Sequence, residues 1–376
     1  MANILVVDDI EDNVFLLRLI LEKLGHSVIP AYNGLEALGV AMKGGVDLVL
    51  LDVMMPVMNG LEAAARLKGS EVTRHIPIIL LTAKKNDVKD IVEGLAAGAN
   101  EYITKPFHET ELVARVNSML QMKALYDEVS SARTLMMEEL RMAQAVQQSL
   151  LPSKFPCSDR VKYAAKYEAT SSLGGDFYDF IDYGSGRVGL VLADVSGHGP
   201  SAALIVSMIK AILGAVEDKD GSPKAVLEKL NETLLKMIPE ERFVTIFYGI
   251  LDSRSGRLVY SRGGHPHPMV LRKKDKAVVP LDAPGDIVGM FETIYMDEVE
   301  ITLEKGDRLL AYSDGLVEAM NAGGDQYGVA NLVNHIKSSW SMDGDALVNG
   351  IFDGVREFLA GEPITDDAAL FVVEMM

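Results

Sequence analysis

Hydrophobic and polar residues follow three different patterns along the chain. In the N-terminal third, short runs that are almost entirely apolar each end at a polar residue, and stretches of helical periodicity separate them, such as 13–24 and 86–97. The apolar runs lie at 4–7, 48–51 and 78–81. Strands that are apolar on both faces and alternate with helices are typical of a parallel sheet covered on each side. We therefore predict a doubly wound, flavodoxin-like α/β domain at 1–120.

The second pattern is a long stretch without helix breakers. Residues 108–151 contain no glycine and no proline, so a helix that starts after Pro106 meets nothing that would end it before Pro152. At about 1.5 Å per residue it would be roughly 65 Å long, far more than a helix inside one domain needs. The helix should connect two domains.

Apolar residues recur within this helix at alternating steps of three and four, which is the spacing of a coiled coil. Glu139 is the one seam position that is not apolar, and Leu135, Leu140 and Met142 form a second, shifted stripe. We predict a coiled-coil linker at 121–151 that pairs two chains in a weakly specified register. A lone amphipathic helix packed along one domain is the alternative. The apolar seam residues are Met122, Leu125, Val129, Ala132, Met136, Ala143, Val146 and Leu150.

The third pattern follows Pro152 and consists of short strands separated by turns. Runs of strands with grouped helices favour stacked antiparallel sheets flanked by helices, so we predict an α+β domain at 152–376. The expected strands are 188–192, 243–251, 257–261, 269–271, 299–303, 308–312 and 368–373. The expected helices are 201–217, 223–237, 330–337 and 346–358.

Composition narrows the class of protein. With 376 residues, 48% of them apolar, the chain is long enough for two cores. It has no run of about 18 apolar residues, and a strand-like segment begins directly at the N-terminus, so we expect a cytoplasmic protein without a membrane partner. The single cysteine, Cys157, excludes an internal disulfide and a thiolate metal cluster. A net charge of −18 argues against nucleic acid as a partner.

Polar residues at the ends of the N-terminal strands form the first candidate site. Asp8, Asp9, Asp52, Thr82 and Lys105 should meet in one crevice, because the carboxyl ends of parallel strands share an edge. Three carboxylates so close together are costly without a cation, and their oxygens suit Mg²⁺. The alternative is an inert flavodoxin-like domain in which these acids only cap strand ends.

These segments resemble the receiver domain of two-component response regulators. The matching pieces are 7–9, 51–56 with Gly60, 81–83 and 102–107. The resemblance implies that Asp52 accepts a phosphoryl group from a histidine kinase, and that the bond before Pro106 is cis. It assigns the Mg²⁺ ligands to Asp8, Asp9, Asp52 and the Met54 carbonyl. It also implies that Thr82 and Lys105 contact the phosphoryl oxygens and that Tyr102 is the switch aromatic.

Acidic residues in the C-terminal part recur at strand ends or in glycine turns and form the second candidate site. They come from four separate segments and offer only oxygen ligands, which favours Mg²⁺ or Mn²⁺ over Zn²⁺. Two such ions can clamp a phosphate and activate a water molecule for in-line attack. The acids are Asp176, Asp194, Asp314, Asp366 and Asp367.

From about Ala143 to the C-terminus, the chain resembles the metal-dependent protein phosphatases (PPM), in the branch typified by RsbU and SpoIIE. The matching blocks are 147–152, 174–179, 194–203, 263–266, 312–318 and 366–367. The resemblance implies that Asp194 bridges two metals. It gives one metal Asp176 and the Val195 carbonyl, and the other Asp314 and Asp366.

Several residues in these blocks are weaker candidates. Asp367 is a less favoured ligand, and Asp179 reads as a turn acid. Better-known eukaryotic members have Gly-His directly after the aspartate, whereas three residues separate Asp194 from His198 here. We therefore expect His198 to cap a helix rather than act as general acid, and we expect His265 and His267, each followed by proline, to be turn residues.

The two resemblances together predict a response regulator whose phosphorylation at Asp52 controls a serine/threonine phosphatase. By analogy, the substrate is a phosphorylated STAS-type anti-sigma-factor antagonist in a partner-switching pathway. A histidine kinase or phosphotransfer protein would act upstream, and the linker would form a homodimer. The alternatives are a phosphorylation-controlled adaptor without turnover and a phosphatase for a small metabolite. The sequence leaves open the cognate kinase, the sign of the control and the choice between Mn²⁺ and Mg²⁺.

Overall fold

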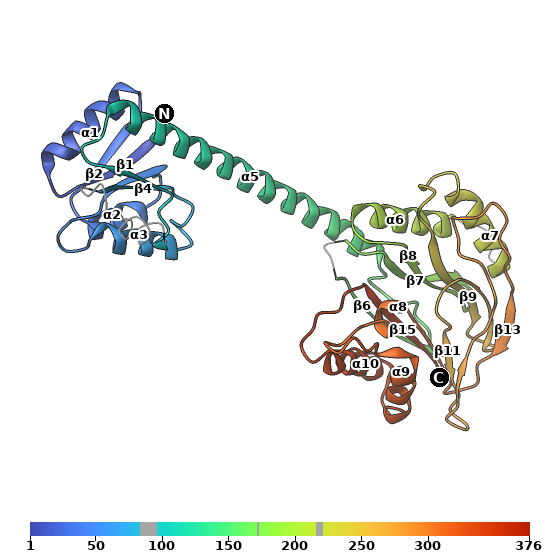
Figure 1. Ribbon diagram of the computed structural model, residues 1–376. Helices are drawn as coiled ribbons and strands as arrows, with labels where there is room; N and C mark the ends of the chain where they lie inside the picture. The colour runs from blue at the N-terminus through green and yellow to red at the C-terminus, as the bar shows by residue number, and fades with distance from the viewer. Residues whose placement is uncertain (83–95, 171–172, 216–220) are drawn as a thin grey trace. The chain divides into compact units, whose positions relative to one another are not determined.

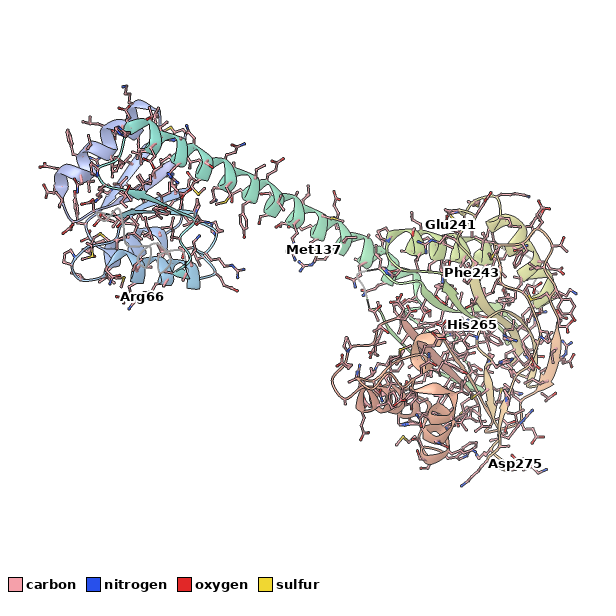
Figure 2. The ribbon with its side chains drawn as sticks, in the orientation of Figure 1. Arg66, Met137, Glu241, Phe243, His265 and Asp275 are labelled. Carbon is pink, nitrogen blue, oxygen red and sulfur yellow. The ribbon has the colours of Figure 1, made fainter. Side chains whose placement is uncertain are left out.

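Two structural units share the chain, Met1–Met137 and Glu138–Met376, and helix α5 (Glu109–Leu150) contributes to both (Figure 1). The computed structural model describes residues 1–82, 96–170, 173–215 and 221–376. Most of the helix expected at 86–97 lies outside these residues, as does the end of the one expected at 201–217. Met137, the last residue of the first unit, lies on α5 (Figure 2).

In its described part, the first unit has a sheet of five parallel strands in the order β2-β1-β3-β4-β5. The strands are β1 (Asn3–Val7), β2 (Ser27–Ala31), β3 (Leu48–Asp52), β4 (Ile78–Thr82) and β5 (Glu101–Thr104). The helices are α1 (Glu11–Lys23), α2 (Gly34–Ala41), α3 (Gly60–Gly69) and the start of α5. The predicted flavodoxin-like α/β fold is confirmed.

Both faces of this sheet are buried, which explains why its strands are apolar throughout. In β1, Leu5 and Val7 pack into a cluster with residues of α2 and α3. Ile4 and Val6 point to the other face and pack with residues of α1 and α5, including Leu112. The carboxyl ends of the strands are thereby held rigidly at one edge.

Helix α5 is continuous over 42 residues, close to the predicted 108–151. Its buried side chains are Leu112, Val116 and Lys123. In the middle of the predicted seam, Val129 is 68% and Met136 61% exposed, so these side chains do not pack against the rest of the first unit. Pairing of two chains through the seam stays a prediction.

In the part of the second unit that the structure describes, two antiparallel sheets of five strands stack on each other. One has the order β13-β10-β9-β8-β7 and the other β12-β11-β14-β15-β6. Helices α6 and α7 cover the first sheet, and α9 and α10 cover the second (Figure 1). This is the predicted arrangement of stacked antiparallel sheets flanked by helices.

The strands of this unit are β6 (Val161–Glu168), β7 (Asp176–Gly184), β8 (Arg187–Val195), β9 (Val244–Asp252), β10 (Arg257–Gly263), β11 (Met269–Leu271), β12 (Val278–Pro280), β13 (Val299–Thr302), β14 (Arg308–Tyr312) and β15 (Ala368–Met375). Its helices are α6 (Pro200–Gly214), α7 (Pro223–Leu234), α8 (Asp314–Val317), α9 (Gly328–Ser338) and α10 (Gly344–Leu359). Each strand expected from the sequence is present, and β6, β7 and β12 are additional. Within the described ranges, no helix combines the length and the apolar character needed to cross a membrane.

Candidate functional sites

The carboxyl edge of the first sheet brings together residues from four strands. Asp8 follows β1, Asp52 and Thr82 end β3 and β4, and Lys105 follows β5. The Lys105 ammonium lies 2.5 Å from Asp8 Oδ2 and also pairs with Asp52 Oδ1. Asp8, Asp52 and Thr82 are all buried, and the Met54 N–H donates a hydrogen bond to Asp52 Oδ2 at 3.0 Å.

Burial dominates the electrostatics of this edge. It raises the pKa of Asp52, although the hydrogen bond and charge of Lys105 act in the opposite direction. Burial alone would lower the pKa of Lys105, but its bonds to Asp52 and Asp8 raise it overall. The lysine therefore stays charged and counterbalances the two buried carboxylates.

The remaining predicted receiver residues lie around this cluster. Asp9 and Met54 are exposed, and the Lys105–Pro106 bond is cis as expected. Tyr102 is half-buried, with the Arg115 guanidinium of α5 at 6.0 Å from its ring centre.

Gly60 explains how helix α3 comes so close to the end of strand β3. A Cβ at this position would lie 2.1 Å from the Asp52 carbonyl oxygen, so no other residue fits without moving the backbone.

The acidic residues of the second unit meet at one end of the sandwich. Asp176 begins β7 directly opposite Asp194 on β8, and Thr245 on β9 lies opposite Asp194 on its other side. Residues that face each other on paired strands share a face of the sheet, so these three form one row. From the other sheet, Ser313 Oγ donates to Asp176 Oδ2 at 2.6 Å, and Asp314 follows Ser313 at the start of α8.

The carboxylates act on one another strongly. Burial, then Asp314 and Asp366, raise the pKa of Asp194 to about 7. Burial and Asp194 raise the pKa of Asp176 well above its ordinary value. Burial and Glu318 raise the pKa of Asp314, so Glu318 is a further acid of this site. It lies in the matching block 312–318 but was not among the predicted site residues.

The donor set fits divalent cations by its chemistry. The Val195 carbonyl lies beside this row, since a Cβ at Gly175 would be 2.6 Å from that oxygen and 3.5 Å from Asp194 Oδ1. Among the described residues, no three Asp, Glu, His or Cys side chains converge tightly enough to hold an ion as they stand. Binding therefore requires the carboxylates to turn toward a shared centre, and a cation would offset their repulsion.

Asp367 and Asp179 have partners within the protein. The buried Asp367 carboxylate accepts hydrogen bonds from Thr170 N at 2.9 Å and from Gly175 N at 2.6 Å, so it holds Gly175, the residue before β7. Asp179 points to the opposite face of β7 from Asp176 and pairs with Lys210 of α6 at 2.6 Å. Asp179 is a buried strand residue, and the expectation of a turn acid is wrong.

The three histidines differ in their surroundings. His198 is exposed, and the cap of α6 is Gly199 at a φ of 85°, with no side-chain hydrogen bond, so the capping expectation for His198 is wrong. His265 follows β10 but is fully buried inside the second unit (Figure 2), with Nδ1 2.9 Å from Thr245 Oγ1. Burial lowers the pKa of His265 to about 3, so the ring is neutral. His267 is exposed, lies in the segment between β10 and β11, and has its Nε2 3.3 Å from Asp282 Oδ1.

Two family models match the chain. One, described as "Stage II sporulation protein E (SpoIIE)", matches residues 184–376, which is more than half of the sequence. The chain belongs to the SpoIIE family. The other, "Response regulator receiver domain", matches residues 4–117, so this SpoIIE-family protein has a receiver domain fused to a PPM-type phosphatase domain.

Similar proteins cover both domains of this SpoIIE-family chain. "Phosphoserine phosphatase RsbU" of Bacillus subtilis is 27% identical over 272 residues, which are 71% of this chain and 79% of RsbU. "Response regulator PleD" of Caulobacter vibrioides is 44% identical over 128 residues, which are 34% of this chain but only 28% of PleD. The solved "SiaA-PP2C domain of Pseudomonas aeruginosa" aligns with 66% of this chain and 100% of its own, at a TM-score of 0.57 and 17% identity, and supports the fold alone.

The raised pKa of Asp194 leads to a prediction for metal binding. Below about pH 7 this carboxyl carries a proton that a cation must displace, so Mn²⁺ affinity of the phosphatase domain should increase as the pH rises from about 6 to about 8. Calorimetric titrations at both values, in two buffers of different ionisation enthalpy, would measure the affinity and the protons released. Equal affinity at both values without proton release would contradict the protonated state.

Proposed function

We propose that this protein is a serine/threonine protein phosphatase that depends on two divalent cations and is controlled by phosphorylation of Asp52. The observation that carries the catalytic part is the row of Asp176 and Asp194 on neighbouring strands, with Asp314 and Asp366 acting on Asp194 from the other sheet. Asp176 is buried, Asp194 and Asp314 are half-buried, and Asp366 is exposed. Acids that repel one another at such a site are costly for a fold unless the site uses them.

The donor positions support a division of the ligands between two ions. Asp194, with Asp176 opposite it on β7 and with Asp314 and Asp366 acting on it, would bridge the pair. Asp176 and the Val195 carbonyl would serve one ion, and Asp314 and Asp366 the other. When bound, two Mg²⁺ or Mn²⁺ ions hold the phosphate and supply an activated water. Ser313 keeps Asp176 in place through its hydroxyl, and the neutral His265 fixes the Thr245 side chain beside Asp194.

A relative, rather than the geometry of the site, supports the proposed substrate class. RsbU is named a phosphoserine phosphatase, and its alignment covers most of both chains. The name supports a phosphoserine as substrate. By analogy with the family branch that the sequence resembles, we propose a phosphoserine or phosphothreonine of a STAS-type anti-sigma-factor antagonist, with partner switching at a sigma factor as the consequence.

Release of phosphate tests the substrate class directly. With Mn²⁺, the protein should hydrolyse a phosphoserine peptide in preference to an aryl phosphate. Turnover of the aryl phosphate alone would favour a small-molecule phosphatase. Binding of the phosphopeptide without turnover would favour an adaptor.

The receiver contacts support control through α5. Arg115 of α5 pairs with Glu101 at 2.7 Å and faces Tyr102, the expected switch aromatic.

The outer face of α1 supports docking of a kinase or phosphotransfer protein. It exposes Phe15, Leu16 and Leu19, and an open groove beside them reaches Lys105. We place the receiver at 1–120, the linker at 121–151 and the phosphatase at 152–376, with a homodimer formed through the exposed seam.

Acetyl phosphate and Mg²⁺ should place a phosphoryl group on Asp52. Its carboxylate lies beside Lys105, which can neutralise the incoming charge, and the Mg²⁺ ligands expected here are Asp8, Asp9 and the Met54 carbonyl. Mass spectrometry of the intact and digested protein would locate the modification, and Asp52→Ala should prevent it. A phosphoryl group elsewhere, or none, would leave the receiver as an inert scaffold.

A further inference from the structure

The last turn of α5 is tied to the loop that precedes Asp176. The Gln147 side-chain amide uses both of its ends on one residue: Nε2 donates to the Gly174 carbonyl oxygen at 2.6 Å, and Oε1 accepts from the Gly174 N–H at 3.1 Å. Two bonds fix the orientation of the backbone as well as its position. Both residues belong to the second unit.

Gly174 is confined on its other sides as well. A Cβ at this position would lie 1.9 Å from the Tyr167 hydroxyl oxygen and 2.5 Å from Asp367 Oδ2. The next residue, Gly175, donates its N–H to the same Asp367 oxygen at 2.6 Å. The loop is therefore held between the linker helix and an acidic segment of the opposite sheet, and Asp176 follows it directly.

We propose that Gln147 is a positioning residue that places Asp176 for metal binding, so that the linker helix sets the cation affinity of the phosphatase. The inference rests on the proposed function, because it takes Asp176 as a ligand. The carboxylates must turn toward a shared centre to hold ions, and a loop fixed at both of its glycines limits how far Asp176 has to move.

The same helix provides a route from the receiver. Near its start α5 carries Arg115, which contacts Glu101 and faces Tyr102, and in its last turn it carries Gln147. No glycine or proline interrupts the helix between them. A turn of α5 about its axis would move the Gln147 amide and with it Gly174.

The neighbouring Gln148, which is exposed, offers a matched control. Gln147→Met and Gln148→Met make the same chemical change, and methionine has a helix propensity and size close to those of glutamine. We would make both in an Asp52→Ala background, so that the receiver does not contribute a second Mn²⁺ site, and measure Mn²⁺ binding by electron paramagnetic resonance. Gln147→Met should weaken binding about 10- to 100-fold, and Gln148→Met should leave it unchanged.

The phosphatase rate separates positioning from other roles. Because all the ligands remain in Gln147→Met, saturating Mn²⁺ should restore most of the rate. Gln147→Glu keeps the acceptor for the Gly174 N–H but loses the donor, so it should bind Mn²⁺ with intermediate affinity. If Gln147→Met melts at a clearly lower temperature than the wild type, Gln147→Glu takes its place in the comparison. With Asp52 intact, beryllofluoride should shift the Mn²⁺ concentration for half-maximal rate in the wild type but not in Gln147→Met.

Equal Mn²⁺ affinity of Gln147→Met and Gln148→Met would overturn the inference, as would a rate loss in Gln147→Met that saturating Mn²⁺ does not restore. If the wild type binds Mn²⁺ but hydrolyses no phosphopeptide, the proposed function fails, and the affinity comparison still decides the role of Gln147.

Discussion

Replacing Asp194 with asparagine should abolish the Mn²⁺-dependent phosphatase activity and leave the fold intact. The carboxylate lies opposite Asp176 and within the field of Asp314, so it is the position from which one side chain can serve two ions. A neutral amide cannot hold two cations together, and its loss of charge relieves the crowding of buried acids. We expect a fall in rate of at least about 100-fold, measured as phosphate release from a phosphoserine peptide.

Two controls make this result interpretable. Asp182→Asn makes the same chemical change at the exposed far end of β7 and should retain wild-type activity. Thermal unfolding should show that Asp194→Asn melts no lower than wild type in the presence of a chelator. If a folded Asp194→Asn protein kept more than a few per cent of the wild-type rate, the assignment of Asp194 as the bridging ligand would be wrong.

Replacing Glu139 with leucine should make phosphatase activity nearly independent of Asp52. Glu139 is the one charged position of a seam whose neighbours, including Met136, are exposed on the single chain. A charge in a coiled-coil seam lowers the stability of that register and leaves the shifted stripe through Leu135 and Met142 as a competitor. Leucine at position 139 should make the first register clearly more stable than the shifted one, so that the helices pair in that register alone.

The measurements for Glu139→Leu are sedimentation and phosphatase rate, each with and without beryllofluoride. The variant should be a firmer dimer than the wild type, with a rate that the mimic does not change. Arg141→Leu adds the same side chain at a nearby exposed position outside both stripes and should behave like the wild type. A wild type that stays monomeric in both states, or a Glu139→Leu protein that responds normally to the mimic, would rule out a switch of register.

Much of the fold could be predicted because the residue pattern of most segments agrees with the helix or strand that they form. Strands β1, β3 and β4 are apolar on both faces, and α5 has no breaker within its length. Strand β2 contains Pro30, and a proline argues against a strand in a sequence-based prediction. It is tolerated here because β2 lies at the edge of the sheet. Strands β6 and β7 mix lysines or aspartates with aromatic residues, so their alternation is weak, and only pairing with the neighbouring strands determines them.

The candidate site could be predicted residue by residue but not as an arrangement. The glycine turns singled out Asp176 and Asp194, but the register that sets them opposite each other and beside Thr245 depends on pairing across the whole sheet. The proline after His265 predicts a turn residue, yet His265 is fully buried and its ring contacts Thr245. The heptad spacing of α5 could not predict the role of Gln147, because its hydrogen-bond partner Gly174 belongs to another segment of the chain.

The most direct test of the central claim is the rate of phosphate release from a phosphoserine peptide by the full-length protein, with Mn²⁺ and Mg²⁺ present, before and after beryllofluoride is added. We expect the mimic to change the rate of the wild type about fivefold or more and to leave the rate of Asp52→Ala unchanged. The same rate before and after the addition, in a wild-type protein shown by mass spectrometry or fluorine magnetic resonance to hold the mimic at Asp52, would contradict control of the phosphatase by its receiver.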